Sequence, residues 1–258
     1  MLLKLLQLNI NADSFWDNLV AFLGNQDFDI IQLQEVAGEN TFVGNIHSTR
    51  SCFALLTQLL KETHDSELVI AETFTSSSSS FLGNATFYKK EFQLLHKECL
   101  HLHQRSLPFP SDEKTFEGQG RAALFLTLQI EGKQLSICNV HFPWAKTPEE
   151  QPHQLAQGEK LLQKIRTLSH PFIISGDFNL TSDQPTIQEL NGIAKNLTTE
   201  FGITNTLNPR QHRAKDIFPK GFAVDYIFIS NDIKTKNFEV LQNEDISDHF
   251  GLTAELEI

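Results

Sequence analysis

The sequence predicts an α/β fold in which two β-sheets pack face to face and helices flank them. Two observations favour it: strand-like apolar runs follow one another in pairs, and amphipathic helical segments come after the first strand and near the middle of the chain. A third observation concerns domain organisation, because no linker or internal repeat interrupts the 258 residues. We therefore expect one domain that spans residues 1–258.

The first half of the chain combines short apolar strands with two amphipathic helices. Trp16, Leu19 and Leu23 recur at helical spacing, and Asp13 or Ser14 can cap the helix that carries them. A second helical stripe of apolar residues follows a loop in the region 52–63. The expected elements are strands at residues 2–9, 29–36, 67–74 and 84–88, and helices at residues 13–25 and 52–63.

The second half is dominated by strands around one long helix. Glu131-Gly132-Lys133 separates two apolar runs and predicts a hairpin, because glycine suits a tight turn between strands. Leucines at helical spacing predict the long helix, and a weaker helical pattern comes after it. The expected elements are strands at residues 92–102, 122–130, 134–140, 172–175, 224–229 and 251–258, a helix at 150–168 and a looser helix at 187–197.

Composition excludes several classes of protein. With 40% apolar and 21% charged residues, the chain is typical of a folded globular protein and not of a disordered one. Its three cysteines show no CxxC spacing, which argues against a disulfide framework or a zinc knuckle and fits a reducing compartment. The chain contains no stretch of about 18 apolar residues, so the sequence predicts no membrane span. The short apolar run at residues 1–8 is interrupted by Lys4 and Gln7, so we expect a buried strand there, no signal peptide and a cytoplasmic location.

The charge balance limits the partners. A formal net charge of −11 disfavours a broad surface that coats nucleic acid, although it leaves room for a local basic groove. Basic residues gather before the strand at 224–229, and among them Arg213 and Lys215 are candidate substrate contacts. The alternative is an ordinary solvated loop. A monomer is favoured.

Polar side chains stand at the ends of the predicted strands. Strand ends lie at the rim of a sheet, where side chains from several strands can converge on one cleft. Taken singly, most of these residues have a structural explanation, such as a turn for Gly176-Asp177-Phe178-Asn179. Asp225 is different, because a carboxylate at the start of so apolar a strand needs a buried partner. The residues concerned are Asn9, Glu35, Asn139, His141, Asp177, Asn179, Asp225, Asp248 and His249.

Together these residue types fit the chemistry of phosphate esters. Carboxylate and amide oxygens are the ligands that Mg²⁺ or Mn²⁺ prefers. Two histidines can bind phosphate oxygens or transfer a proton near neutral pH. The set therefore predicts metal-assisted attack of water on phosphorus.

Six short motifs follow one another along the chain from residue 8 to residue 249. They are Leu8-Asn9-Ile10, Leu33-Gln34-Glu35-Val36, Asn139-Val140-His141, Gly176-Asp177-Phe178-Asn179, Val224-Asp225-Tyr226-Ile227 and Ser247-Asp248-His249. In this order they resemble the endonuclease/exonuclease/phosphatase superfamily. The resemblance implies a deoxyribonuclease-I-like fold, a four-layer α-β-β-α sandwich.

The resemblance also implies which residues hold the metal and activate the water. Glu35 matches the family's principal metal ligand, with Asn9 and Asp248 beside it. Asp177 matches the residue that orients and deprotonates the attacking water. Asn179 is expected to hold that water or a phosphate oxygen. The implied cofactor is Mg²⁺ or Mn²⁺.

The remaining roles implied by the resemblance concern the phosphate. His141 and His249 are expected to bind the scissile phosphate and to stabilise charge in the transition state. Asp225 is expected to hydrogen-bond one of these imidazoles, that of His249. Asn139 is either a substrate contact or a supporting residue, and Arg121 reaches either a phosphate or a structural ion pair.

The function that we expect is a divalent-metal-dependent hydrolase of phosphate esters, with a phosphodiester in DNA or RNA as the leading substrate. One alternative is a phosphatase or phosphodiesterase that acts on a small-molecule or lipid-derived phosphate. Another is a binding scaffold without catalysis, whose signature is the loss of Glu35, Asp177 or His249. All three residues are present, which argues against the scaffold.

Overall fold

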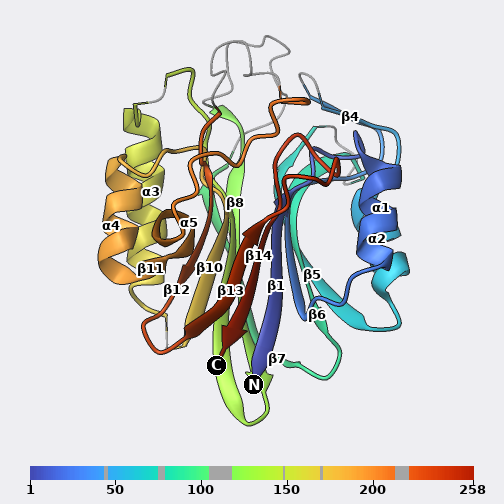
Figure 1. The fold of residues 1–258 in the computed structure, drawn as a ribbon. Helices are drawn as coiled ribbons and strands as arrows, with labels where there is room; N and C mark the ends of the chain where they lie inside the picture. The colour runs from blue at the N-terminus through green and yellow to red at the C-terminus, as the bar shows by residue number, and fades with distance from the viewer. Residues whose placement is uncertain (44–45, 75–78, 105–117, 148, 169–170, 213–220) are drawn as a thin grey trace.

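Two six-stranded sheets pack face to face, and helices cover the outer face of each (Figure 1). The computed structural model describes the chain apart from residues 44–45, 75–78, 105–117, 148, 169–170 and 213–220. The predicted four-layer α-β-β-α sandwich is therefore confirmed. In the described part of the chain, no helix has the length and apolar character needed to cross a membrane.

The first sheet has the strand order β13-β14-β1-β2-β6-β5. Its central strands β1 and β2 run parallel and are joined by the crossover helix α1, whereas all other neighbours are antiparallel. Helix α2 lies beside α1 on the same outer face (Figure 1). The bounds are β1 (Leu2–Asn9), α1 (Trp16–Gly24), β2 (Ile30–Ala37), α2 (Cys52–Leu60), β5 (His64–Thr73), β6 (Phe81–Lys89), β13 (Lys234–Val240) and β14 (Leu252–Glu257).

The second sheet repeats this plan with the order β11-β12-β10-β9-β8-β7. Strands β9 and β10 are the parallel pair, and α3 forms the crossover between them. Helices α3 and α4 cover the outer face (Figure 1). The bounds are β7 (Gln93–His103), β8 (Arg121–Ile130), β9 (Lys133–His141), α3 (Pro152–Ile165), β10 (Phe172–Asp177), α4 (Pro185–Ile193), β11 (Lys195–Asn196), α5 (Leu197–Glu200) and β12 (Asp225–Ile229).

The alternation of side chains along each strand separates three apolar cores. On β1, Leu3 and Leu5 enter the core between the sheets, whereas Leu6 and Leu8 face α1 and α2. The core outside the second sheet is formed in the same way by residues such as Val140, which belongs to one cluster with the helices α3 and α4. Hydrophobic burial on both faces of both sheets therefore holds the four layers together.

The space between the sheets changes character along its length. It is apolar at the end where both termini lie, and it becomes polar toward the opposite end, where β1 finishes with Gln7 and Asn9 on the inner face (Figure 1). Because β1, β2, β9 and β10 all run toward that end, and β12 begins there, five strands present residues to one place.

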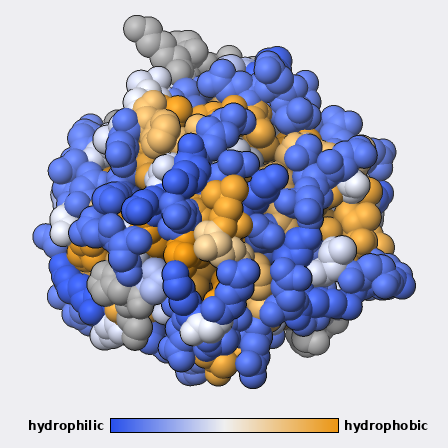
Figure 2. Space-filling view, turned by 60° about the horizontal axis from the view of Figure 1, so that its bottom comes forward, coloured by the Kyte–Doolittle hydropathy of each residue, from blue (hydrophilic) through white to orange (hydrophobic). Residues whose placement is uncertain are grey.

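The end that carries the termini shows scattered apolar patches on a largely hydrophilic surface (Figure 2).

The observed elements differ from the predicted ones in three places. Strand β13 was not expected, because it is an edge strand in which Phe238 alone is buried, so its apolar pattern is weak. The short hairpin of β3 (Thr41–Val43) and β4 (Ile46–Ser48) was also not expected. The looser helix predicted at residues 187–197 is three elements, α4, β11 and α5, because Ala194 is in an extended conformation and ends α4.

Candidate active site

A β-bulge directs Glu35 into the space between the sheets. Along β2, Leu33 pairs with Ala85 and Val36 pairs with Gly83, so that Gln34 and Glu35 together face one residue of β6. Glu35 has a φ of 54°, a left-handed conformation that is unfavourable for a residue with a side chain. Regular alternation would send either Gln34 or Glu35 to the helical layer. The bulge allows both side chains to point inward.

Asp177 stands at the end of β10, directly after a glycine that the pairing of strands requires. A Cβ atom on Gly176 would lie 1.9 Å from the carbonyl oxygen of Val140, so no other residue fits here without a shift of β9. The Oδ2 atom of Asp177 accepts a hydrogen bond of 3.0 Å from Asn9 Nδ2, and Oδ1 accepts one of 2.9 Å from the backbone N–H of Asn179. The carboxylate is thus held from both sheets.

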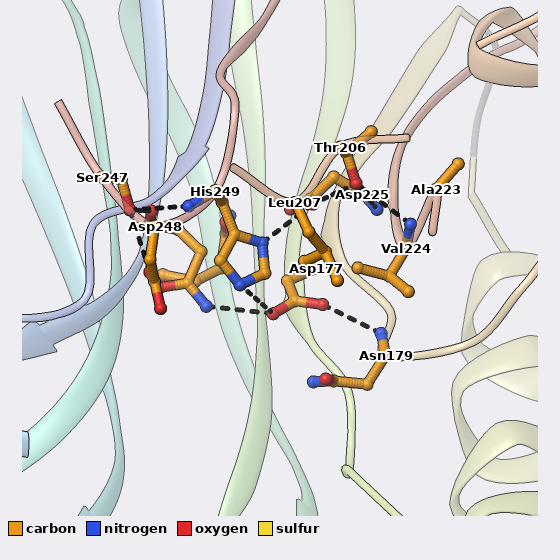
Figure 3. Close-up of polar contacts among 12 residues, drawn as sticks. Asp177, Asn179, Thr206, Leu207, Ala223, Val224, Asp225, Ser247, Asp248 and His249 are labelled. Atoms are coloured by element: carbon orange, nitrogen blue, oxygen red, sulfur yellow. Dashed lines mark hydrogen bonds and ion pairs between the residues drawn. The ribbon is translucent and has the colours of Figure 1, made fainter. Parts of the chain in front are cut away.

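His249 lies between two carboxylates. Its Nδ1 atom is 2.9 Å from Asp225 Oδ2, and its Nε2 atom is 3.9 Å from Asp177 Oδ2 (Figure 3). Asp225 is itself fixed by Thr206 Oγ1, which donates to Oδ2 at 2.6 Å, and by Gln7 Nε2, which donates to Oδ1 at 3.1 Å. The predicted hydrogen bond between Asp225 and His249 is therefore present, and it presents Nε2 to the site.

His141 is the second imidazole at this place. It ends β9, and its Nε2 atom lies 3.7 Å from Asp177 Oδ2 and 3.9 Å from Glu35 Oε1. These distances are longer than hydrogen bonds, so His141 Nε2 is not bonded directly to either carboxylate. Asp177 therefore lies within 4 Å of both imidazoles.

Burial makes two of the acidic groups in the site, Glu35 and Asp177, weaker acids. It raises the pKa of Glu35 to about 7, and the negative charge of Asp248 adds to this effect. Burial likewise raises the pKa of Asp177 to about 6, although the neighbouring imidazole of His249 acts in the opposite direction. In the metal-free protein both groups therefore bind a proton more readily than an exposed carboxylate does.

The same environment shifts the pKa values of His249 and His141 in opposite directions. Burial alone would lower the pKa of His249, but the carboxylates of Asp225 and Asp177 outweigh it and hold that pKa well above 6.5. Burial, the positive charge of Arg121 and that of His249 hold the pKa of His141 well below 6.5. The surroundings thus favour the cationic form of His249 and the neutral form of His141, and opposed shifts of this kind are typical of acid–base pairs in active sites.

The donor set fits a divalent metal ion. The buried carboxylate of Glu35, which faces the charge of Asp248, is stabilised when a cation is close. Asn9 Oδ1 accepts a hydrogen bond of 3.1 Å from the N–H of Asn11, and one lone pair stays available. Within the described part of the chain, two groups of acidic and histidine side chains have ligand atoms within 4.8 Å of one another: His212, Asp248 and His249, and Asp177, Asp225 and His249. A bound divalent ion would polarise a phosphoryl oxygen and offset the charge that develops on it.

Arg121 is buried at the start of β8, with 7% of its surface exposed. Its guanidinium donates to two carbonyl oxygens, that of Phe142 at 3.2 Å and that of Gly120 at 3.1 Å. It also donates to Gln119 Oε1 at 2.7 Å. Its positive charge acts on Glu35, whose pKa it lowers against the larger effect of burial. The structure therefore places Arg121 as a buried cation close enough to Glu35 to act on its charge.

Asn139 lies beneath the site and not in it. Its side chain is fully buried, and its Nδ2 atom donates to the carbonyl oxygens of Leu33 at 3.1 Å and Ala85 at 2.9 Å. Its Oδ1 atom accepts from Gln34 Nε2 at 2.7 Å. Because every polar atom of this side chain is used within the protein, the expected substrate contact at Asn139 is replaced by the supporting role that the sequence also allowed.

The candidate substrate contacts before β12 are placed differently. Arg213 and Lys215 lie outside the described residues. Arg210 is described and forms an ion pair with Asp245 at 2.7 Å, so part of the basic cluster is neutralised within the protein. Arg213 and Lys215 stay predictions.

A family model for the endonuclease/exonuclease/phosphatase family matches residues 6–249, which includes every motif of the site. The chain belongs to the endonuclease/exonuclease/phosphatase family. The resemblance found in the sequence is thereby confirmed, and the chain has the phosphoesterase fold of a family whose members hydrolyse phosphate esters. Comparison with curated protein sequences finds no significant match.

Solved structures of the family superpose over almost the whole chain. An endonuclease/exonuclease/phosphatase from Bacteroides vulgatus has a TM-score of 0.70 and 20% identity, covering 100% of this chain and 99% of its own. A mannosyl-6-phosphatase from Bacteroides thetaiotaomicron has a TM-score of 0.71 and 16% identity, covering 99% of this chain and 100% of its own. The human Nocturnin catalytic domain, with a bound sulfate anion, has a TM-score of 0.69 and 18% identity, covering 99% of this chain and 93% of its own. At these identities the likeness shows the shared fold.

Three residues of this family site were missed in the sequence. Gln7 and Thr206 both donate to Asp225, and Gln34 bonds to Gln7 just beneath the site. All three side chains are fully buried. Gln7 lies two residues before Asn9, so strand alternation places both on the same face, and that was the available signal. Thr206 offered no comparable pattern, because it lies in a loop between α5 and β12.

Proposed function

We propose that this protein is a divalent-metal-dependent phosphoesterase that hydrolyses phosphodiesters by attack of an activated water. The observation that carries the proposal is the position of Asp177, which lies within 4 Å of both imidazoles. A carboxylate with a pKa near 6 is well suited to act as a general base close to neutral pH. Asn9 and the backbone N–H of Asn179 hold it in place.

The roles of the other residues follow from their charge. Glu35 and Asp248, with Asn9, would hold Mg²⁺ or Mn²⁺, because hard cations bind carboxylate and amide oxygens. The cationic imidazole of His249 donates a hydrogen bond from Nε2 to a phosphoryl oxygen and stabilises the charge that develops there. The neutral imidazole of His141 lies opposite and binds the same phosphate group.

A phosphodiester is the leading substrate class, because the basic residues that precede β12 in an otherwise acidic chain are suited to contact a chain of phosphates. DNA or RNA is the leading diester, and Arg213 and Lys215 are the candidate contacts to its backbone.

A small-molecule or lipid-derived phosphate is the second candidate. The observation that favours it is the mannosyl-6-phosphatase of similar fold, which matches this chain over the full length of both proteins. The scaffold alternative finds no support, because Glu35, Asp177 and His249 are all present and converge on one place.

A panel assay tests the proposal. The purified protein is incubated with Mg²⁺ or Mn²⁺ and with single- and double-stranded DNA, RNA, an abasic duplex, bis-p-nitrophenyl phosphate, p-nitrophenyl phosphate, inositol phosphates and mannose 6-phosphate. We expect metal-dependent cleavage of the diesters, abolished by EDTA and by Asp177→Asn. Turnover of monoesters alone would establish the second candidate, and no turnover of any ester would contradict the enzyme proposal.

A further inference from the structure

A chain of three buried side-chain amides lies directly beneath the site and connects the two sheets. It consists of Asn139 on β9, Gln34 on β2 and Gln7 on β1, and we call it the amide chain. Gln34 Nε2 donates to Asn139 Oδ1 at 2.7 Å, and Gln7 Nε2 donates to Gln34 Oε1 at 2.9 Å. Gln7 Nε2 also donates to Asp225 Oδ1 at 3.1 Å. All three side chains are fully buried.

The direction of these hydrogen bonds is fixed by the backbone. Carbonyl oxygens only accept, so the bonds from Asn139 Nδ2 to Leu33 O and Ala85 O determine which end of the Asn139 amide carries the nitrogen. Asn139 Oδ1 must then face Gln34, which turns Gln34 Nε2 toward it and leaves Gln34 Oε1 facing Gln7. Gln7 must therefore present its NH₂ group, whose second proton is directed to Asp225.

The orientation of Gln7 has a cost. Among the described residues, its Oε1 atom has no hydrogen-bond partner although it is buried. An unsatisfied buried acceptor destabilises a fold, and each such atom calls for an explanation. The reversed amide would bring Gln7 Oε1 against two acceptors, Gln34 Oε1 and Asp225 Oδ1, which is worse. The fold thus keeps the hydrogen bond from Gln7 Nε2 to Asp225 and leaves Gln7 Oε1 unsatisfied within the described part of the chain.

We propose that Gln7 is a positioning residue for the reaction, and that the amide chain gives it that role. By donating to Asp225 Oδ1, Gln7 orients the carboxylate so that Oδ2 accepts from His249 Nδ1. The imidazole is thereby held with Nε2 toward Asp177. The inference rests on the proposed function for its kinetic consequence, but the orientation of His249 can be measured without any substrate.

Gln32 provides a matched control on the neighbouring strand. It pairs with Gln7 across β1 and β2, is equally buried, and also has one amide atom, Nε2, with no partner among the described residues. Its Oε1 atom accepts from Ser175 Oγ, and it does not contact Asp225. Replacing either glutamine by methionine removes the same amide from the same layer.

The first readout is the imidazole of His249. Proton–nitrogen NMR spectra of metal-free protein labelled with ¹⁵N-histidine report its hydrogen-bonded Nδ1–H, assigned by its absence in His249→Gln. We expect Gln7→Met to shift or broaden this signal and Gln32→Met to leave it in place. An unchanged signal in Gln7→Met overturns the inference.

The second readout separates catalysis from folding. We expect Gln7→Met to lower kcat by about 10–100-fold, the usual effect of losing a partner that orients a site residue, with little change in KM. Gln32→Met should keep kcat close to that of the wild type even if its melting temperature falls equally. Equal kcat losses in the two variants would show that the amide layer acts through stability alone.

A third measurement keeps the inference testable if Gln7→Met does not fold. In wild-type protein and in Asp225→Asn, the side-chain NH₂ signals of Gln7 and Gln32 are compared. We expect the Gln7 signals to move and the Gln32 signals to stay, and unmoved Gln7 signals would overturn the proposal. If the wild type turns over no phosphate ester, the proposed function fails, while both NMR measurements still decide the role of Gln7.

Discussion

His249 and Asp225 form a buried pair in which Nδ1 lies 2.9 Å from Oδ2, and their side chains are 7% and 0% exposed. Removing one member of such a pair leaves the other charge without its partner in a low-dielectric environment. The pair also decides which ring nitrogen faces Asp177, because the proton on Nδ1 is directed to Asp225. The two residues are therefore expected to act as one unit.

A double substitution tests that unit. His249→Ala should lower kcat by roughly 10²–10³-fold, the effect of losing a preorganised donor to the developing charge. Asp225→Asn should also lower kcat, because the orientation of the imidazole is lost. When Asp225→Asn is combined with His249→Ala, kcat should fall little further than in His249→Ala alone, since the effects of residues that act through one group are not additive. Steady-state kinetics of the two single variants and the double variant measure this, and fully multiplicative losses would place Asp225 in another role.

Glu35→Gln tests the metal site. An amide has nearly the size of the carboxylate but lacks its charge, so we expect weaker Mg²⁺ binding and loss of turnover in a protein that still folds. Calorimetric titration with Mg²⁺ and circular dichroism provide the measurements. Glu39→Gln is the control, because Glu39 is exposed just after the same strand. Unchanged Mg²⁺ affinity in Glu35→Gln would remove Glu35 from the ligand set.

The raised pKa of Glu35 predicts how stability depends on pH without metal. Its pKa is about 7 in the folded protein against an ordinary value of 4.5, so the folded state binds the proton more tightly. The resulting stabilisation is complete below about pH 4.5 and is lost as the pH rises through about 7. In Glu35→Gln, the loss of unfolding free energy between these values should be smaller by up to roughly 3 kcal/mol. Urea unfolding at several pH values in EDTA measures it, and equal pH slopes in both proteins would contradict the assignment.

The positions of the site residues were predictable because each follows from local pattern. Asn9, Asp177 and Asp225 stand at the ends of apolar runs, and strand direction then brings those ends together. The fold class followed in the same way from the pairing of strands and the placement of helices. The catalytic and metal-binding roles of these residues came from the resemblance of the ordered motifs to the family, because the apolar pattern alone does not assign roles.

What stayed hidden depends on contacts between distant parts of the chain. The bulge at Glu35 requires a left-handed backbone that its sequence does not signal, since no glycine marks it. Gln7 and Asp225 are separated by 218 residues, and Gln34 and Asn139 by 105. A glutamine within a strand indicates an exposed face from pattern alone, so the amide chain needed the packing of the second sheet to become visible.

The basic residues that precede β12 in the sequence predict a dependence on salt. If Arg213 and Lys215 contact a nucleic-acid backbone, binding of DNA or RNA by the inactive Asp177→Asn protein should weaken steeply as salt is added. Changing both residues to alanine should reduce the slope of log K against log salt by up to about one unit per lost contact. Lys234→Ala with Lys236→Ala on β13 removes the same charge elsewhere and should leave the slope unchanged. Equal slopes in all three proteins would favour the small-molecule substrate.

Asp177→Asn separates activation of the water from binding of the metal. The substitution removes the proposed base, so the chemical step should slow by roughly 10²–10⁴-fold, measured in single turnovers with saturating Mg²⁺. Mg²⁺ affinity should fall much less than in Glu35→Gln, because Asp177 is not assigned as a ligand. Some stability should also be lost, since the new NH₂ group must face either Asn9 Nδ2 or the N–H of Asn179, both of which are donors. Asp183→Asn, which makes the same charge change in the loop before α4, should leave the rate unaltered. If Asp177→Asn lost metal and activity in parallel with Glu35→Gln, Asp177 would be a metal ligand and the base would have to be sought elsewhere.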